Sequence, residues 1–174
     1  MAGRTRFTII LFLLLNLIPL RAADLSLEYQ VKAAFLLNFT KFIEWPPDSA
    51  GAAAPAAICI LGEDPFGPAL DQMVRGETLQ GRRLEVLRVR HPLPATCKVL
   101  FISRSEKDIP VILQSLDPGI LTVSEGSGFL EAGGIVDFVV ESHRVRFDIN
   151  QSAATKAQLK ISSKLLNVAR SVEK

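Results

Sequence analysis

The chain has 174 residues, of which 48% are hydrophobic and 22% charged, so it can bury the core of one domain. Its formal net charge at pH 7 is +2, and loss of Arg4, Arg6 and Arg21 with residues 1–22 would change it to −1 (+2 − 3). This balance excludes the strongly basic surface of a nucleic-acid-binding protein, and we expect no nucleic-acid partner.

The N-terminal residues have the three parts of a secretory signal peptide. Arg4 and Arg6 precede an apolar run over 7–20, and Ala22 and Ala23 follow it. The run is too short to span a hydrocarbon layer comfortably, which takes about 20 residues. We therefore expect residues 1–22 to be a signal peptide, cleaved after Ala22 or Ala23, and residues 23–174 to be one periplasmic domain. An uncleaved N-terminal anchor is the alternative.

The first half of this domain predicts alternating helices and strands. Apolar side chains recur at helical spacing over 26–45, and Pro46 and Pro47 are expected to end that helix. Two shorter helices are predicted, one capped by Asp64 and reaching Arg75, the other capped by Ser105 and ending near Leu116. Strands are predicted at 57–61, 83–90, 99–102 and 120–123.

The C-terminal part predicts a β-hairpin over 135–150 and a final helix over about 152–171. A four-residue loop at 140–143 would place Asp137 opposite Arg146, whereas a two-residue turn would place it opposite Asp148. We prefer the longer loop because it pairs opposite charges. The predicted fold class is α/β: a mainly parallel sheet flanked by helices on both faces, with a C-terminal antiparallel hairpin and a final helix.

Cys59 and Cys97 enclose 37 residues. In an oxidising compartment two cysteines favour a disulfide, and closing this loop would stabilise the fold by roughly 4 kcal/mol; two buried thiols are the alternative. No Cys-x-x-Cys motif exists, and His91 and His143 stand alone, so we expect no metal site.

Catalytic motifs are incomplete in this chain. Ser127 lies in Glu-Gly-Ser-Gly, which lacks the first glycine of a nucleophile elbow, and Glu131 replaces the third glycine of a dinucleotide loop begun by Gly126 and Gly128. There is no phosphate-binding Gly-Lys-Ser/Thr sequence. We therefore predict a binding protein that is not an enzyme and uses no cofactor.

Three features indicate binding. Lys156, Lys160 and Lys164 would share one face of the final helix, either solvated or holding an anion beside Ser162 or Ser163. Trp45 is either a core anchor or a pocket wall. The glycine-rich segment 124–134, with Phe129 and Leu130, is either a binding loop or a plain connection.

Several stretches together resemble the YfiR family of periplasmic proteins. They are 31–46 (VKAAFLLNFTKFIEWP), 58–62, 97–102, 121–124, 134–138, 145–150 and 159–166. The resemblance covers nearly all of 23–174 and implies a compact α/β regulator that binds a membrane-bound signalling protein. It implies repression of a diguanylate cyclase from the periplasmic side, and hence lower cyclic di-GMP.

The resemblance also assigns residues. It implies a disulfide between Cys59 and Cys97 and partner contact in the segment around Phe129, where Phe129 and Leu130 are our candidates for apolar contacts. It implies a pocket for a small anionic or polar ligand between the first and last helices, built from Lys41, Lys160 and Ser162, to which we add Trp45 as a candidate wall. Some relatives carry a second cysteine pair in the glycine-rich region, and 124–134 has none. A periplasmic small-molecule binder without a cyclase partner is the alternative function, and the oligomeric state stays open, with a homodimer as one option.

Overall fold

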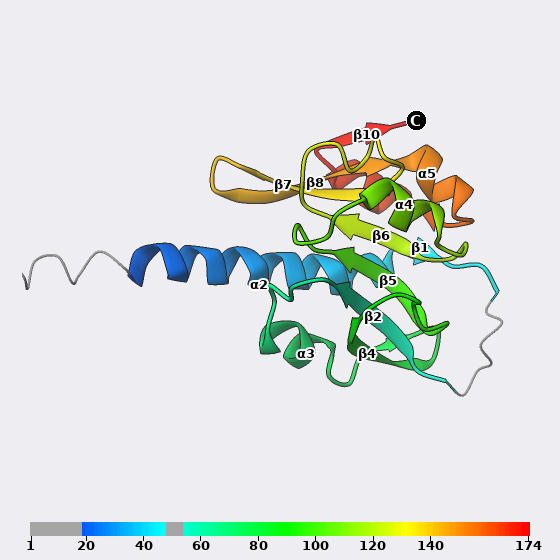
Figure 1. The fold of residues 1–174 in the computed structure, drawn as a ribbon, viewed down its shortest axis with the longest axis horizontal. Helices are drawn as coiled ribbons and strands as arrows, with labels where there is room; N and C mark the ends of the chain where they lie inside the picture. Colours follow the sequence, from blue (N-terminus) through cyan, green and yellow to red (C-terminus); the bar gives the residue numbers. More distant parts are fainter. Residues whose placement is uncertain (1–18, 48–53) are drawn as a thin grey trace, which may run out of the picture.

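The computed structural model describes residues 19–47 and 54–174 (Figure 1). Most of the expected signal peptide lies outside these residues; Pro19–Ala22 are helical and begin α2. The elements in chain order are α2 (Pro19–Lys41), β1 (Ile43–Glu44), β2 (Ala56–Leu61), α3 (Pro68–Val74), β3 (Thr78–Leu79), β4 (Arg82–Val89), β5 (Cys97–Ile102), α4 (Ile109–Gln114), β6 (Leu121–Ser124), β7 (Val136–Glu141), β8 (Arg144–Asn150), α5 (Gln151–Lys156), β9 (Lys160–Ile161), α6 (Ser163–Val168) and β10 (Ser171–Glu173).

Eight strands of the described chain form one mixed sheet in the order β10-β8-β7-β6-β5-β2-β4-β3. The pairs from β4 through β7 and the β8–β10 pair are parallel, whereas β7–β8, β3–β4 and the separate β1–β9 ladder are antiparallel. The α/β class is confirmed, but the expected mainly parallel sheet is corrected to a mixed one. Two-residue turns at Gln80–Gly81 and Ser142–His143, all with positive φ, can join only antiparallel strands.

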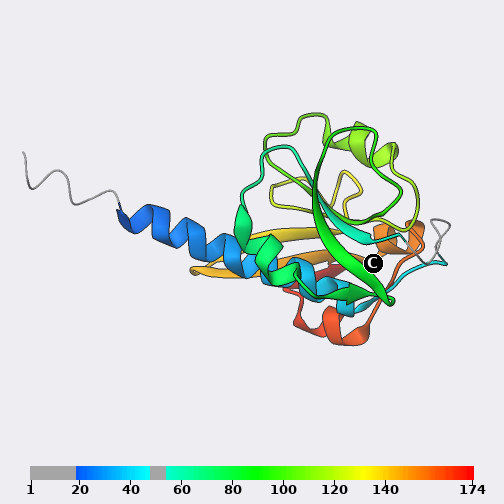
Figure 2. The same cartoon turned by 90° about the horizontal axis from the view of Figure 1, so that it is seen from below.

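The two faces of the sheet are covered differently (Figure 2). On one face, α2 packs Phe35 and Phe39 against Phe138 and Phe147, with ring centroids 5.1–6.1 Å apart. The buried cluster on the other face is smaller. It contains the disulfide, one buried side chain of α4 and side chains of the irregular segment 125–134. We name these the helix-covered face and the loop-covered face.

The first helix ends earlier than predicted. It stops at Lys41, four residues before Trp45, and Ile43 and Glu44 then pair with Ile161 and Lys160. The prolines are therefore not what ends the helix; pairing with β9 draws the chain away first.

Both short helices also begin later than predicted. Asp64 does not cap α3: its Oδ1 accepts the N–H groups of Phe66 and Gly67, which makes a turn before Pro68. Ser105 does not cap α4 either, because its hydroxyl accepts the N–H of Glu63 at 2.9 Å.

The hairpin has the register that we did not prefer. Ser142 and His143 have φ of 48° and 60°, which makes a two-residue turn and sets Asp137 opposite Asp148. Arg170 relieves the like-charge pair, since its Nε donates to Asp148 Oδ1 at 2.9 Å. The expected pair between Asp137 and Arg146 is therefore wrong, since Arg146 lies opposite Val139 and Arg170 binds Asp148 instead.

The prediction of a single final helix is also wrong. Gln158 has φ of 59° and ends α5, after which the chain forms β9, α6 and β10. Lys156, Lys160 and Lys164 therefore do not share a helical face. Ser162 is the N-cap of α6, where its hydroxyl accepts the N–H of Leu165.

Candidate functional site

The carboxyl ends of the central parallel strands meet at one edge of the sheet. The chain passes from β2 to β4 on one side and then crosses to β5 on the other, which makes β2 and β5 a topological switch point. In open α/β sheets ligands bind outside the strand ends at such a point. Here the segments after β2, β5 and β6 come together, so this edge is the place to look for a site.

A buried charge cluster lies at this edge. Lys32 of α2 is completely buried and forms ion pairs with Glu28, one turn earlier, and with Glu125 after β6. Tyr29 donates its hydroxyl to Glu125 Oε1 at 2.7 Å. Burial, and then this bond to Glu125, raises the pKa of Tyr29. Because removing either charge would leave the other buried without its closest partner, the cluster ties α2 to segment 125–134.

Arg104 closes the cluster on its solvent side. Its Nε donates to the Glu125 carbonyl oxygen at 2.8 Å and lies 3.5 Å from Glu125 Oε1. Its side chain stays two-thirds exposed, at 67%. Arg104 thus contributes little to the buried pair but leaves guanidinium N–H groups available to solvent or to an anion.

Asp137 is a carboxyl near this edge whose pKa is raised. Burial raises its pKa to about 6, and the carboxylates of Asp148 and Glu125 add to the shift. The Gly126 N–H, which donates to Asp137 Oδ1 at 3.0 Å, opposes it. Asp137 therefore has a raised pKa and accepts the backbone N–H that starts the glycine-rich segment.

An open cleft of about 560 Å³ adjoins the cluster. Polar groups line much of it, including Ser103, Arg104, Glu106, Ser124 and Ser127. Gly62 lies beside it with φ of 89°, and a Cβ there would lie 2.5 Å from Ser105 Oγ, so only glycine fits. Among the described residues no group of three His, Cys, Asp or Glu side chains could hold a metal ion. The cleft offers hydrogen bonds and one exposed cation.

Phe129 and Leu130 do not offer the surface that the sequence suggested. Both are buried, with Phe129 only 4% exposed, and they pack in the loop-covered face. The Phe129 ring lies directly against Gly134, where a Cβ would come within 2.2 Å of it. In this segment the exposed positions are Gly126, Ser127, Gly128, Glu131 and Gly133. Any contact made here by the two apolar side chains would require them to leave the core.

The expected ligand pocket is only partly assembled. Trp45, Lys160 and Ser162 lie around the β1–β9 ladder, but Lys41 pairs with Glu77 at 3.2 Å. Lys160 is exposed and pairs with Glu44. Trp45 is buried, and its Nε1–H has no acceptor among the described residues. Ser162 is already engaged as a helix cap.

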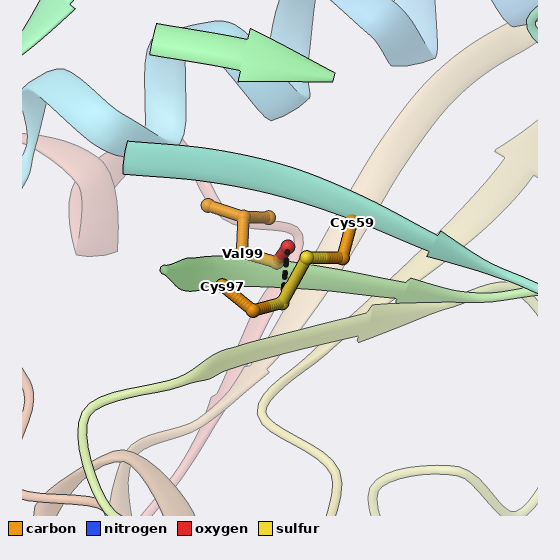
Figure 3. Close-up of a disulfide and its surroundings, with 3 residues drawn as sticks. All are labelled: Cys59, Cys97 and Val99. Atoms are coloured by element: carbon orange, nitrogen blue, oxygen red, sulfur yellow. Dashed lines mark hydrogen bonds between the residues drawn. A yellow bond between two sulfur atoms is a disulfide. The ribbon is translucent and has the colours of Figure 1, made fainter. Parts of the chain in front are cut away.

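The disulfide joins neighbouring parallel strands (Figure 3). Cys59 of β2 and Cys97 of β5 have Cα atoms 5.9 Å apart, and Cys97 Sγ lies 3.6 Å from the Val99 carbonyl oxygen. Both cysteines are buried in the loop-covered face, which confirms the predicted bridge.

Sequence reasoning missed the charge cluster. Lys32 lies three residues from Tyr29 and four from Leu36, inside the apolar stripe of the helix. A charged residue within such a stripe needs a buried partner, and that was the available signal. Glu125 carried no comparable signal, because it is 93 residues away.

A family model described as YfiR/HmsC-like matches residues 29–170 of the chain. No curated protein matches it. In the described part of the chain, no helix combines the length and the hydrophobicity needed to cross a membrane.

Proposed function

Because the chain belongs to the YfiR/HmsC-like family of periplasmic regulators, we propose that it binds and represses a membrane-bound diguanylate cyclase, and so lowers cyclic di-GMP. The family match over residues 29–170 is the observation that carries this proposal. The signal-peptide pattern of residues 1–22 supports it, because export would place the domain on the same side of the membrane as a sensor's periplasmic part.

The structure is consistent with binding rather than covalent chemistry as the basis of this function. The buried ionic groups Lys32 and Glu125 form an ion pair with each other. A regulator of this kind acts by binding one state of its partner better than another and shifting their populations.

The experiment measures cyclic di-GMP in cells with and without the protein. Deletion should raise cyclic di-GMP, and the full chain should restore the original level. The matched control is a chain that starts at Ala23 and lacks the leader, which should accumulate in the cytosol and fail to restore it. An unchanged cyclic di-GMP level on deletion, or restoration by the leaderless chain, would contradict the proposal.

A second candidate function is binding of a small anionic or polar molecule without a cyclase partner. The observation in its favour is the open polar cleft with the exposed guanidinium of Arg104. A thermal-shift screen of small carboxylates and phosphates should then find a stabilising ligand whose effect is lost in Arg104→Gln. A response that is equal in Arg104→Gln would exclude the cleft.

A further inference from the structure

The N-terminal half of α2 and the tip of the β7–β8 hairpin project from the same side of the domain (Figures 1 and 2). Further along, the C-terminal half of α2 packs against the hairpin, because Phe35 and Phe39 contact Phe147 of β8 at 5.3 and 5.1 Å between ring centroids. The tip extends beyond β10, the strand that pairs with β8 at its other end.

No strand of the described residues pairs with the outer edge of β8 near this tip. β10 pairs only with Asp148, Ile149 and Asn150, and the Arg170 N–H donates to the Phe147 carbonyl oxygen. In the antiparallel ladder Arg144 and Arg146 bond toward β7, since Glu141 and Arg144 close the two-residue turn. The N–H and C=O of Val145 therefore point to the open edge, where a further strand can bond to them.

The helix-covered side of this edge is apolar and exposed. Leu27, Val31 and Phe35 recur every four residues along α2, and only Phe35 is packed against the sheet. Leu27 is 60% exposed, Val31 37% and Val140, at the hairpin tip, 48%. Val140 and its cross-strand partner Val145 lie on the same face as Phe138 and Phe147, so this apolar surface continues the core outward.

On its opposite side the outer strand β8 presents basic residues, while the exposed Glu141 of β7 lies opposite Arg144. Arg144 and Arg146 alternate with Val145, so they lie on the face away from α2, and both are exposed. Neither forms an ion pair with another described residue. An occupant of the edge would thus meet cations on one face and apolar side chains on the other.

We infer that the β8 edge over residues 144–146 receives an extended segment of a partner protein that alternates acidic and apolar residues. Such a segment adds a strand to the sheet through Val145, places its carboxylates opposite Arg144 and Arg146, and covers Val140 and Val31 with its apolar side chains. This inference rests on the proposed function, since it names the surface through which the regulator holds its partner.

Charge and backbone together favour this occupant over an anionic membrane. A lipid surface would be attracted by Arg144 and Arg146 but would leave the Val145 N–H and C=O without partners, which costs free energy in an apolar contact. A strand satisfies these groups, the charges and the apolar surface at once. Membrane adsorption is therefore the competing outcome that the experiment must separate.

The direct probe is a blocked hexapeptide of alternating Glu and Val, with a Lys and Val hexapeptide as its control. With isotope-labelled protein, we expect the acidic peptide to shift the amide signals of 144–147 in proportion to its concentration, and the basic peptide to leave them unchanged. Added salt should weaken the shift.

Three variants sharpen this test. Val145→Pro removes the open N–H without touching the β7 ladder, and proline is tolerated on strand edges, so binding should be lost while the melting temperature changes little. The double variant Arg144→Glu with Arg146→Glu should bind the basic peptide in preference to the acidic one. Arg83→Glu, on β4 near the opposite edge of the sheet, is the matched control and should bind like the unmodified protein.

Shifts that are equal for both peptides, absent for both, or kept in Val145→Pro would overturn the inference. So would binding of the protein to anionic phospholipid vesicles that is unchanged in Val145→Pro and competes with the peptide. In cells, full repression by Val145→Pro would overturn the surface while leaving the proposed function in place. A lack of repression by the unmodified protein would instead contradict the proposed function itself.

Discussion

The helix-covered and loop-covered faces of the sheet are shielded from solvent by different means. On the first, one long helix buries a cluster of aromatic rings, which is the burial that contributes most per side chain. On the second, an irregular segment and a short helix bury less, and a disulfide joins the two strands beneath them. The Lys32–Glu125 pair connects the two coverings. The comparison teaches that the glycine-rich segment is part of the core, held by one charge and one aromatic side chain.

The strongest test of this comparison places a charge in the loop-covered face. Phe129→Asp should lower the free energy of unfolding by at least the 3–5 kcal/mol of a Phe to Ala change, because a carboxylate would be buried without a partner. Ser127→Asp, in the exposed part of the same segment, is the control and should be near neutral. Urea unfolding measures both, and a native-like midpoint for Phe129→Asp would mean that the side chain is not in the core.

The connection between the two faces can be broken at Lys32. Lys32→Met should cost about 3–5 kcal/mol, since it leaves Glu125 buried without its closest cation and with only the largely exposed Arg104 nearby. The double variant Lys32→Met with Glu125→Gln removes both charges and should recover much of that loss. If the double variant loses as much unfolding free energy as Lys32→Met and Glu125→Gln lose in sum, the two residues are not coupled.

The covalent part of the loop-covered face is tested by Cys59→Ser. We expect a loss of about 2–4 kcal/mol, because the unfolded chain regains the freedom of the loop between Cys59 and Cys97. The matched measurement is the unmodified protein with and without reductant, which should show the same decrease in unfolding midpoint. An unchanged midpoint in reductant would show that the bridge does not stabilise the domain.

The smallest effect is expected at Asp137, which holds the start of the glycine-rich segment. Its folded pKa of about 6 lies above its ordinary value, so the folded state binds more protons than the unfolded state between about pH 4 and 6. The contribution of Asp137 to stability is therefore present at low pH and is lost as pH rises through 6. Asp137→Asn keeps the acceptor for Gly126 and should be more stable than the unmodified protein at pH 7, with the difference disappearing near pH 4. A difference that grows on acidification would contradict this sign.

The sequence predicted the central strands well because β2, β5 and β6 are short, almost wholly apolar runs that have no other stable place than the interior. It failed where long-range pairing decides. Ala154, Ala157, Ile161 and Leu165 have helical spacing, yet pairing of Ile161 with Ile43 breaks that helix. The hairpin register depends on Ser142 and His143 adopting positive φ, for which the usual Asn-Gly signal is missing.

The site was harder to predict than the fold. Cys59 and Cys97 have chemistry that points to one another, whereas Lys32 and Glu125 are two of many charged residues until the topology brings them together. Phe129 is apolar in a glycine-rich stretch, a pattern that suits both an exposed loop and a buried one. Only its contact with Gly134 distinguishes them.

The most direct test of the proposed regulation is a reconstituted one. Membranes that contain the candidate diguanylate cyclase, opened so that both faces are accessible, are given GTP with increasing amounts of the purified domain over residues 23–174. We predict that cyclic di-GMP synthesis falls to a low plateau as the domain is added, and that the domain sediments with these membranes. Synthesis that stays constant at saturating domain, for every membrane cyclase of the same cell, would contradict the account.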